Sequence, residues 1–218
     1  MRARLDPRSL RLYVVTGAGL VAGRDHRDVA LAAIAGGATA VQLRAPELAD
    51  ADLLPLAREV AASCREAGVV LVVNDRVEVA AAIGCGAHVG QDRDAGEARS
   101  ALGPASILGV SVADPEQARA AEASGADYLG VTVWATATKP EAVPAGLDGL
   151  RAIVRATALP VVGIGGIDAR NAPEVLAAGA VGVAVISAVA AAPDPVAATR
   201  ELAQVVRSVV GRAEVGER

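Results

Sequence analysis

Two cationic residues stand out in a sequence that uses arginine for almost all of its positive charge. Lys139 is the single lysine beside 20 arginines, and it lies in the stretch "ATATKP" with Thr136 and Thr138. Arg44 comes directly after an apolar run, two residues after Gln42. A lysine ammonium is a compact, freely rotating charge, whereas the arginine guanidinium is a planar fork. Both groups bind phosphate oxygens, so we interpret Arg44 and Lys139 as candidate phosphate ligands.

Carboxylates stand at the ends of two further apolar runs. Asp75 follows Asn74 after a run of valine and leucine, although aspartate is a poor strand residue. Asp75 could cap the next helix, or it could bind Mg²⁺, which takes one or two carboxylates together with phosphate oxygens. The segment "GQDRD" offers a second carboxylate from Asp92 or Asp94. Two acidic groups beside a phosphate would repel it unless a cation lay between them, so the pair favours the Mg²⁺ hypothesis.

Two turns near the C-terminal end of the chain are suited to binding an anion. "GIGGI" contains Gly165 and Gly166, and "VIS" contains Ile186 and Ser187. Glycine lets the backbone approach an anion closely. A tight turn alone would also explain the glycines, but both turns follow apolar runs, and phosphate sites in barrels often use the loops after the last two strands. We therefore predict a phosphate site here.

These side chains can act together only if the fold brings them to one place. Short apolar segments typical of buried strands occupy residues 10–17, 35–44, 67–75, 83–91, 105–111, 123–131, 159–166 and 177–187. Runs with helical spacing alternate with them, such as 27–35, 51–67, 115–123 and 171–179. This alternation predicts a parallel sheet, and eight units in a chain of this length predict a single (β/α)8 TIM barrel over residues 1–218. A doubly wound open sheet is the alternative.

A barrel would gather the polar residues that follow its strands. Active sites of such barrels lie at the carboxyl ends of the strands. The residues expected at this rim are Thr16, Gln42, Arg44, Asn74, Asp75, Gln91, Asp92, Asp94, Ser111, Thr136, Thr138, Lys139, Gly165, Gly166, Ile186 and Ser187.

Composition limits the possible partners and location. The net charge is −4, aromatic residues make up 1% of the chain, and there is no basic cluster, so we expect no nucleic-acid binding. No apolar run approaches the roughly 20 residues that span a bilayer, and the N-terminus lacks a signal-peptide pattern. Cys64 and Cys85 have no metal-site spacing, which favours two reduced thiols in a cytoplasmic protein. The polar tail at 211–218 is expected to fray.

Longer motifs across the chain resemble the thiamine-phosphate synthase family, also called thiamine-phosphate pyrophosphorylase. The matching stretches, in the family's order, are "VQLR" (41–44), "VVNDRVEVA" (72–80), "AHVGQDRD" (87–94), "ILGVS" (107–111), "ADYLGV" (126–131), "TATK" (136–139), "VVGIGGI" (161–167) and "AGAVGVAVIS" (178–187). The resemblance implies a (β/α)8 barrel that joins 4-amino-5-hydroxymethyl-2-methylpyrimidine diphosphate to a thiazole phosphate, releasing pyrophosphate. It also implies small-molecule substrates, Mg²⁺ as cofactor and a homodimer.

The same resemblance assigns roles to the rim residues. Arg44, Lys139 and Ser111 would act in catalysis by stabilising the departing diphosphate. Mg²⁺ would bind Asp75 and a carboxylate of the "GQDRD" segment, with Asp94 slightly favoured over Asp92. Substrate binding would involve Gln42, Arg44, Asn74, Ser111, Thr136, Thr138, Lys139, Gly166, Ile186 and Ser187. His26 and His88 would need no catalytic role, and His88 is expected to pack or to orient a neighbour.

Three positions depart from the family's pattern. Pro46 replaces a lysine two residues after Arg44, so one diphosphate contact is missing or is supplied by another residue. Arg93 occupies the usual place of the second Mg²⁺ carboxylate, between Asp92 and Asp94. "GVTVW" is one residue shorter than the family's segment.

Three other functions are consistent with parts of the pattern. A thiazole tautomerase would share the barrel, but that group carries a histidine shortly after the strand-5 serine, where this chain has Ala113 and Asp114. A Schiff-base aldolase would use Lys139, which would need a desolvated pocket. A non-catalytic phosphate-ligand-binding paralogue would agree with the changes at Pro46 and Arg93.

Overall fold

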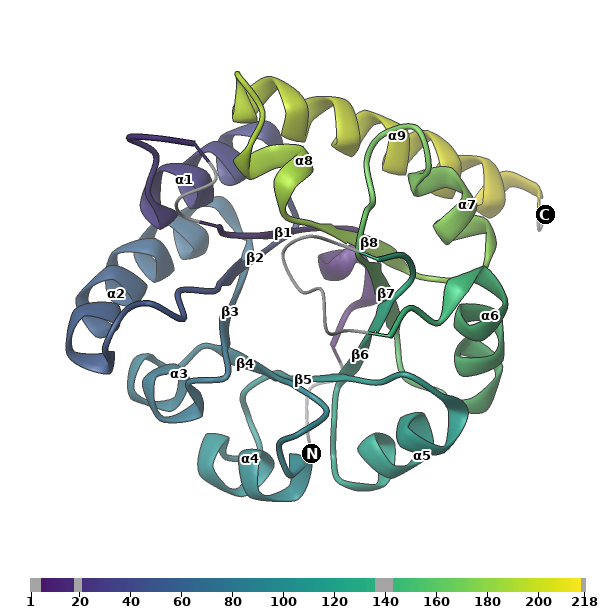
Figure 1. The fold of residues 1–218 in the computed structure, drawn as a ribbon, viewed down its shortest axis with the longest axis horizontal. Helices are drawn as coiled ribbons and strands as arrows, with labels where there is room; N and C mark the ends of the chain where they lie inside the picture. The colour runs from purple at the N-terminus through teal and green to yellow at the C-terminus, as the bar shows by residue number, and fades with distance from the viewer. Residues whose placement is uncertain (1–4, 18–20, 136–142, 217–218) are drawn as a thin grey trace.

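Eight parallel strands close into one barrel in the computed structural model, which describes residues 5–17, 21–135 and 143–216. Each strand pairs with the next along the chain, and the last strand pairs with the first, for example Tyr13 opposite Ala184. Figure 1 looks along the barrel, with the strands in a central ring and the helices around it. The barrel prediction is confirmed, and the open-sheet alternative is wrong because no strand edge is left unpaired in this closed sheet.

The strands are short and alternate with helices. The strands are β1 (Leu12–Val15), β2 (Ala40–Leu43), β3 (Val70–Asn74), β4 (Gly86–Val89), β5 (Leu108–Ser111), β6 (Tyr128–Thr132), β7 (Val161–Ile164) and β8 (Gly182–Val185). The helices are α1 (His26–Gly36), α2 (Asp50–Ala67), α3 (Val77–Ile83), α4 (Ala95–Leu102), α5 (Pro115–Ala123), α6 (Gly146–Ala156), α7 (Ala172–Ala177), α8 (Ser187–Ala190) and α9 (Pro195–Gly216). A 3₁₀ turn, η1 (Pro7–Leu10), precedes β1.

Two apolar clusters hold the barrel together. The larger cluster fills the space between the strands and the surrounding helices. The smaller one lies inside the barrel and includes Tyr13 and Tyr128, with Leu10 of η1 at the amino-terminal end. Because successive strand residues point to opposite faces, both faces of every strand are buried, and the strands are apolar almost throughout.

Helix α9 extends to Gly216, into the tail at 211–218 that was expected to fray. The fraying stays a prediction. Cys64 is buried and Cys85 is half-buried, and both are free thiols. Burial raises the pKa of Cys64 to about 11 and that of Cys85 to about 12, so both thiols are protonated at neutral pH. No helix in the described ranges is long and apolar enough to cross a membrane.

Helices α1 and α9 touch at a glycine. A Cβ on Gly36 would lie 2.4 Å from Thr199 Cβ and 2.8 Å from the Val196 carbonyl oxygen. Real Cβ atoms do not approach other atoms this closely, so only glycine lets the two helices meet here.

We predict that Gly36→Ala destabilises the protein by about 1–3 kcal/mol, because the added methyl group overpacks the helix contact. Gly211→Ala is the matched control: it is also a helical glycine, but a Cβ there meets nothing within 4 Å. The control should stabilise the fold by about 0.5–1 kcal/mol. Urea unfolding of both variants measures the difference. Equal stability of the two variants would contradict the packing argument.

Candidate active site

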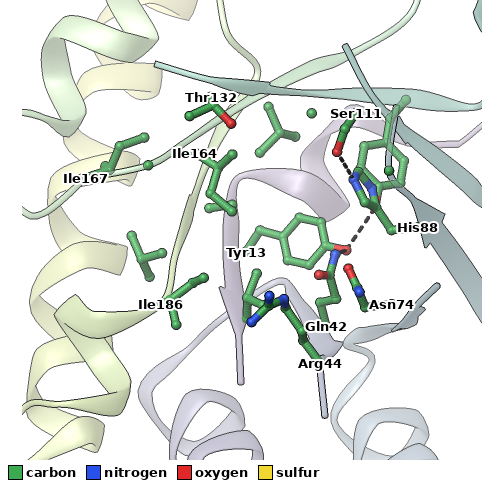
Figure 2. Close-up of a pocket in the computed structure, with 18 of the residues that line it drawn as sticks. Tyr13, Gln42, Arg44, Asn74, His88, Ser111, Thr132, Ile164, Ile167 and Ile186 are labelled. Atoms are coloured by element: carbon green, nitrogen blue, oxygen red, sulfur yellow. Dashed lines mark hydrogen bonds between the residues drawn. The ribbon is translucent and has the colours of Figure 1, made fainter. Parts of the chain in front are cut away.

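A cavity of about 280 Å³ opens among the carboxyl ends of the strands. Nine of the residues predicted to act on a substrate or metal line it: Gln42, Arg44, Asn74, Asp75, Asp92, Ser111, Gly166, Ile186 and Ser187. Figure 2 shows the polar side chains of Gln42, Asn74 and Ser111 on one side of the pocket and the isoleucines on the other. The barrel therefore brings residues from β2, β3, β5, β7 and β8 to one place, as the rim hypothesis requires.

Asp75 is held in an unusual backbone conformation. Its φ is 58°, in the left-handed region that aspartate tolerates better than most residues. The backbone N–H of Asp75 donates to the His88 carbonyl oxygen. Its carboxylate accepts from Asn74 Nδ2 at 2.6 Å and from the Gly90 N–H at 3.3 Å. The helix-cap explanation is wrong, because Arg76 occupies the N-cap of α3 and no side chain caps that end.

Asp92 and Asp94 take different positions. The Arg93 N–H donates to the Gly90 carbonyl oxygen in a turn, and Asp92 lines the cavity. A Cβ on Gly90 would lie 2.5 Å from Asp92 Oδ1, so this carboxylate lies over Gly90. Asp94 is not among the cavity residues; it caps α4 by accepting from the Glu97 N–H at 2.8 Å. Asp75 and Asp92 therefore both approach Gly90.

A hydrogen-bonded cluster fixes the loop that carries Arg44. Thr16 follows β1 at the carboxyl end of the strand, as expected, but it is fully buried, and its Oγ1 accepts from the Arg44 N–H at 3.0 Å. His26 Nδ1 lies 2.9 Å from the same oxygen, and His26 Nε2 lies 2.5 Å from Glu47 Oε1. Burial alone would raise the pKa of the Glu47 carboxyl. Hydrogen bonds from His26 and from the Glu47 backbone N–H, together with the charges of His26 and Arg44, outweigh burial and lower that pKa. Thr16, His26 and Glu47 thus hold residues 44–47 against the rim.

A second hydrogen-bonded chain crosses the barrel interior. Gln42 Nε2 donates to the Tyr13 hydroxyl at 2.9 Å, and that hydroxyl lies 2.8 Å from the Tyr128 hydroxyl. His88 Nδ1 lies 3.0 Å from Tyr128, and His88 Nε2 lies 2.9 Å from Ser111 Oγ. The expectation that His88 orients a neighbour agrees with this geometry. The sequence pattern did not identify the two tyrosines, since each lies in an apolar run.

The opposite side of the cavity combines apolar side chains with a glycine turn. Gly165 and Gly166 have φ values of 95° and 63°. A Cβ on Gly165 would also lie 2.5 Å from the Trp134 carbonyl oxygen, so the turn requires glycine. Asn171 Nδ2 donates to the Gly166 carbonyl oxygen at 2.8 Å and anchors the turn. Ile164, Ile167 and Ile186 face the cavity beside it (Figure 2).

Three predicted residues lie outside the described part of the chain: Thr136, Thr138 and Lys139. The structure describes the chain up to Ala135 and again from Val143. The Ala145 N–H donates to the Thr132 carbonyl oxygen at 2.8 Å, so the resumed chain begins beside the carboxyl end of β6.

Comparisons with known proteins agree with this geometry. The family model described as thiamine monophosphate synthase matches residues 12–189. The thiamine-phosphate synthase of Moorella thermoacetica is 49% identical over 205 residues, which cover 92% of this chain and 98% of the relative. That of Chloroflexus aurantiacus is 51% identical, covering 90% and 92%. The solved thiamine phosphate pyrophosphorylase from Pyrococcus furiosus superposes with a TM-score of 0.87 at 39% identity, covering 94% of this chain and 99% of that one.

The matched model spans all eight strands and the residues that line the cavity between them. With relatives near half identity over nearly their full length, this chain belongs to the thiamine monophosphate synthase family.

Proposed function

We propose that this chain joins 4-amino-5-hydroxymethyl-2-methylpyrimidine diphosphate to a thiazole phosphate, giving thiamine phosphate and pyrophosphate. The observation that carries the proposal is a single cavity lined by Arg44, by the carboxylates of Asp75 and Asp92, and by the Gly165–Gly166 turn. This combination suits two phosphorylated substrates. Family membership assigns the reaction class.

The polar side of the cavity suits the pyrimidine diphosphate. Arg44 can donate to diphosphate oxygens through its planar fork. Gln42 is 6% exposed and held by Tyr13, so its amide is fixed for binding a heteroaromatic ring edge. Asn74 and Ser111 line the same side of the cavity, and Ser111 adds a hydroxyl (Figure 2). Lys139 would add a further positive charge to the departing diphosphate.

Asp75 and Asp92 fit Mg²⁺ by their chemistry. Both carboxylates line the cavity and approach Gly90, and hard carboxylate oxygens are the ligands that Mg²⁺ takes in proteins. Within the described ranges no group of three or more His, Cys, Asp or Glu side chains could hold a metal, so substrate phosphate oxygens would complete the coordination. When bound, the ion neutralises charge on the leaving diphosphate. The position of Asp92 favours it over Asp94 as the second ligand.

The apolar side of the cavity suits the thiazole phosphate. Ile164, Ile167 and Ile186 offer an apolar surface for a five-membered ring. Backbone N–H groups at Gly166 and Ser187 can donate to its phosphate, with Thr136 and Thr138 as further contacts. Opposed binding sites for the two substrates would hold the thiazole nitrogen in line with the pyrimidine methylene carbon.

The mechanism needs no nucleophilic side chain. The bond between the methylene carbon and the diphosphate oxygen breaks, and both electrons leave with pyrophosphate. The resulting pyrimidine cation is attacked by the thiazole nitrogen, which forms the new carbon–nitrogen bond. Arg44, Ser111 and Lys139 stabilise the negative charge that develops on the leaving group. Proximity of the two substrates supplies much of the remaining acceleration.

The comparisons support none of the alternative functions. Shortly after the strand-5 serine, where a tautomerase would carry histidine, this chain has Ala113 and Asp114, and Asp114 caps α5 by accepting from two backbone N–H groups. The family match favours neither an aldolase nor a non-catalytic paralogue. The homodimer stays a prediction.

The direct experiment mixes the purified protein with both substrates and Mg²⁺ and measures thiamine phosphate and pyrophosphate. We expect the two products to form in equal amounts, and we expect EDTA to stop the reaction. Lys139→Ala should lower kcat by at least about tenfold while circular dichroism stays unchanged, because charge stabilisation is lost in the transition state. Absence of product from the wild-type protein would overturn the proposed function.

The choice between the two aspartates can be tested with matched variants. Asp92→Asn should raise the Mg²⁺ concentration for half-maximal rate by about tenfold or more, because a metal ligand loses its charge. Asp94→Asn should leave this concentration unchanged, since asparagine also caps helices well. Magnesium titrations of the initial rate measure both. The reverse pattern would assign the metal to Asp94.

The cluster around His26 should act on substrate binding through Arg44. His26→Ala removes the hydrogen bonds to Thr16 and Glu47, so we predict a KM for the pyrimidine diphosphate raised about three- to tenfold with a smaller change in kcat. Arg27→Ala is the control on the same helix, because its partner is Glu59 on α2. If both variants share the same KM, the positioning argument is wrong.

A further inference from the structure

The chain of hydrogen bonds inside the barrel joins two residues that face the substrate. It runs from Gln42 through Tyr13, Tyr128 and His88 to Ser111. Gln42 and Ser111 both line the cavity, on β2 and β5. The three residues between them belong to β1, β6 and β4, so the path passes through the barrel interior and not along its rim.

The number of available protons restricts the directions of the hydrogen bonds between Gln42 and Ser111. Each tyrosine hydroxyl has one proton, and a neutral imidazole has one N–H and one acceptor nitrogen. If Gln42 Nε2 donates to Tyr13, then Tyr13 donates to Tyr128, and Tyr128 donates to His88 Nδ1. His88 Nε2–H then donates to Ser111, whose own proton points to a ligand. The opposite arrangement requires Ser111 to donate to His88 and Tyr13 to donate to Gln42 Oε1.

We propose that this chain is a polarity relay: an anion that accepts from Ser111 sets the direction of every bond and so fixes the orientation of the Gln42 amide. Tyr13, Tyr128 and His88 are positioning residues in this relay. The inference rests on the proposed function, because the diphosphate is the anion at Ser111 and the pyrimidine ring is the group that Gln42 binds.

The surroundings keep the relay intact. Tyr13 and Tyr128 are 2% and 0% exposed, and burial raises the pKa of both hydroxyls well above its ordinary value, so each keeps its proton. A Cβ on Gly109 would lie 2.4 Å from both the Tyr128 hydroxyl and His88 Nδ1. A Cβ on Gly130 would lie 3.0 Å from His88 Cε1. Glycines on β5 and β6 therefore leave the space in which the hydrogen bond between Tyr128 and His88 forms.

The relay predicts which pyrimidines are accepted. With an anion at Ser111, Gln42 uses one N–H for Tyr13 and keeps Oε1 and its other N–H for the ligand. This pair complements an amino group beside a ring nitrogen, as glutamine does with the amino edge of adenine. A pyrimidine with an oxo group beside a ring N–H can bind in the same way only if the Gln42 amide rotates by half a turn, so that Oε1 and Nε2 exchange places. Turning it makes Tyr13 the donor to Oε1 and reverses the relay, so Ser111 can no longer donate to the diphosphate.

The first test follows the histidine tautomer, independently of activity. The chain contains two histidines, so nitrogen–proton correlation NMR gives few signals, and His26→Gln identifies those of His88. On addition of inorganic pyrophosphate and Mg²⁺, neutral His88 should carry its proton on Nε2, with Nδ1 as acceptor. A proton on Nδ1 in that complex would overturn the relay.

The second test measures substrate discrimination in Tyr128→Phe, which removes the central hydroxyl. The ratio of kcat/KM for the amino substrate over its oxo analogue should fall about tenfold, because Gln42 can then turn without affecting Ser111. Tyr13→Phe should also lower this ratio. Thr199→Val is the control: it removes a buried hydroxyl that donates to the Pro195 carbonyl oxygen outside the cavity, and it should keep the wild-type ratio.

The outcomes separate this inference from the proposed function. If the wild-type protein makes thiamine phosphate and Tyr128→Phe keeps the wild-type ratio, the relay is wrong and the function stands. If the wild-type protein makes no product, the proposed function is wrong, and the NMR result with inorganic pyrophosphate and Mg²⁺ decides whether the polarity is set as described.

Discussion

Closure of the sheet is the constraint on which the site depends. Eight parallel strands that pair in sequence order and return to the first have all their carboxyl ends at one rim. Arg44 and Ser187 are far apart in sequence, and the strands that they follow do not pair with each other, yet both residues line one cavity. The rim can combine cationic, acidic and glycine-rich loops because each loop varies without changing the strands.

The barrel interior contributes more than packing. Glycines on β5 and β6 leave space for Tyr128 and His88, and the tyrosine hydroxyls, which would be costly to bury alone, bond to each other and to His88. The same bonds hold Gln42 and Ser111 at the cavity surface. Outside the barrel, Thr16, His26 and Glu47 do the same for the Arg44 loop. The same hydrogen bonds thus satisfy buried polar groups and fix side chains that line the cavity.

Sequence reasoning identified the strands and the polar residues that end them, because glycine turns and apolar runs mark both. It could not identify Tyr13 and Tyr128 as interior polar groups, since strands buried on both faces give no alternation that separates inside from outside. It favoured Asp94 slightly over Asp92, whereas Asp92 lines the cavity and Asp94 caps α4. Sequence spacing could not show the turn in which the Arg93 N–H donates to the Gly90 carbonyl oxygen. The polar composition of the tail did not indicate that α9 extends to Gly216.

The central claim is that rupture of the carbon–oxygen bond precedes attack by the thiazole nitrogen, with charge stabilisation as the main task of the rim. Pyrimidine diphosphate with an isotopically labelled bridging oxygen tests it directly, when incubated with enzyme and Mg²⁺ but without thiazole phosphate. Reversible bond rupture predicts that the label in recovered substrate moves into non-bridging positions of the adjacent phosphate. A label that stays in the bridge, in enzyme that condenses both substrates normally, would contradict the account.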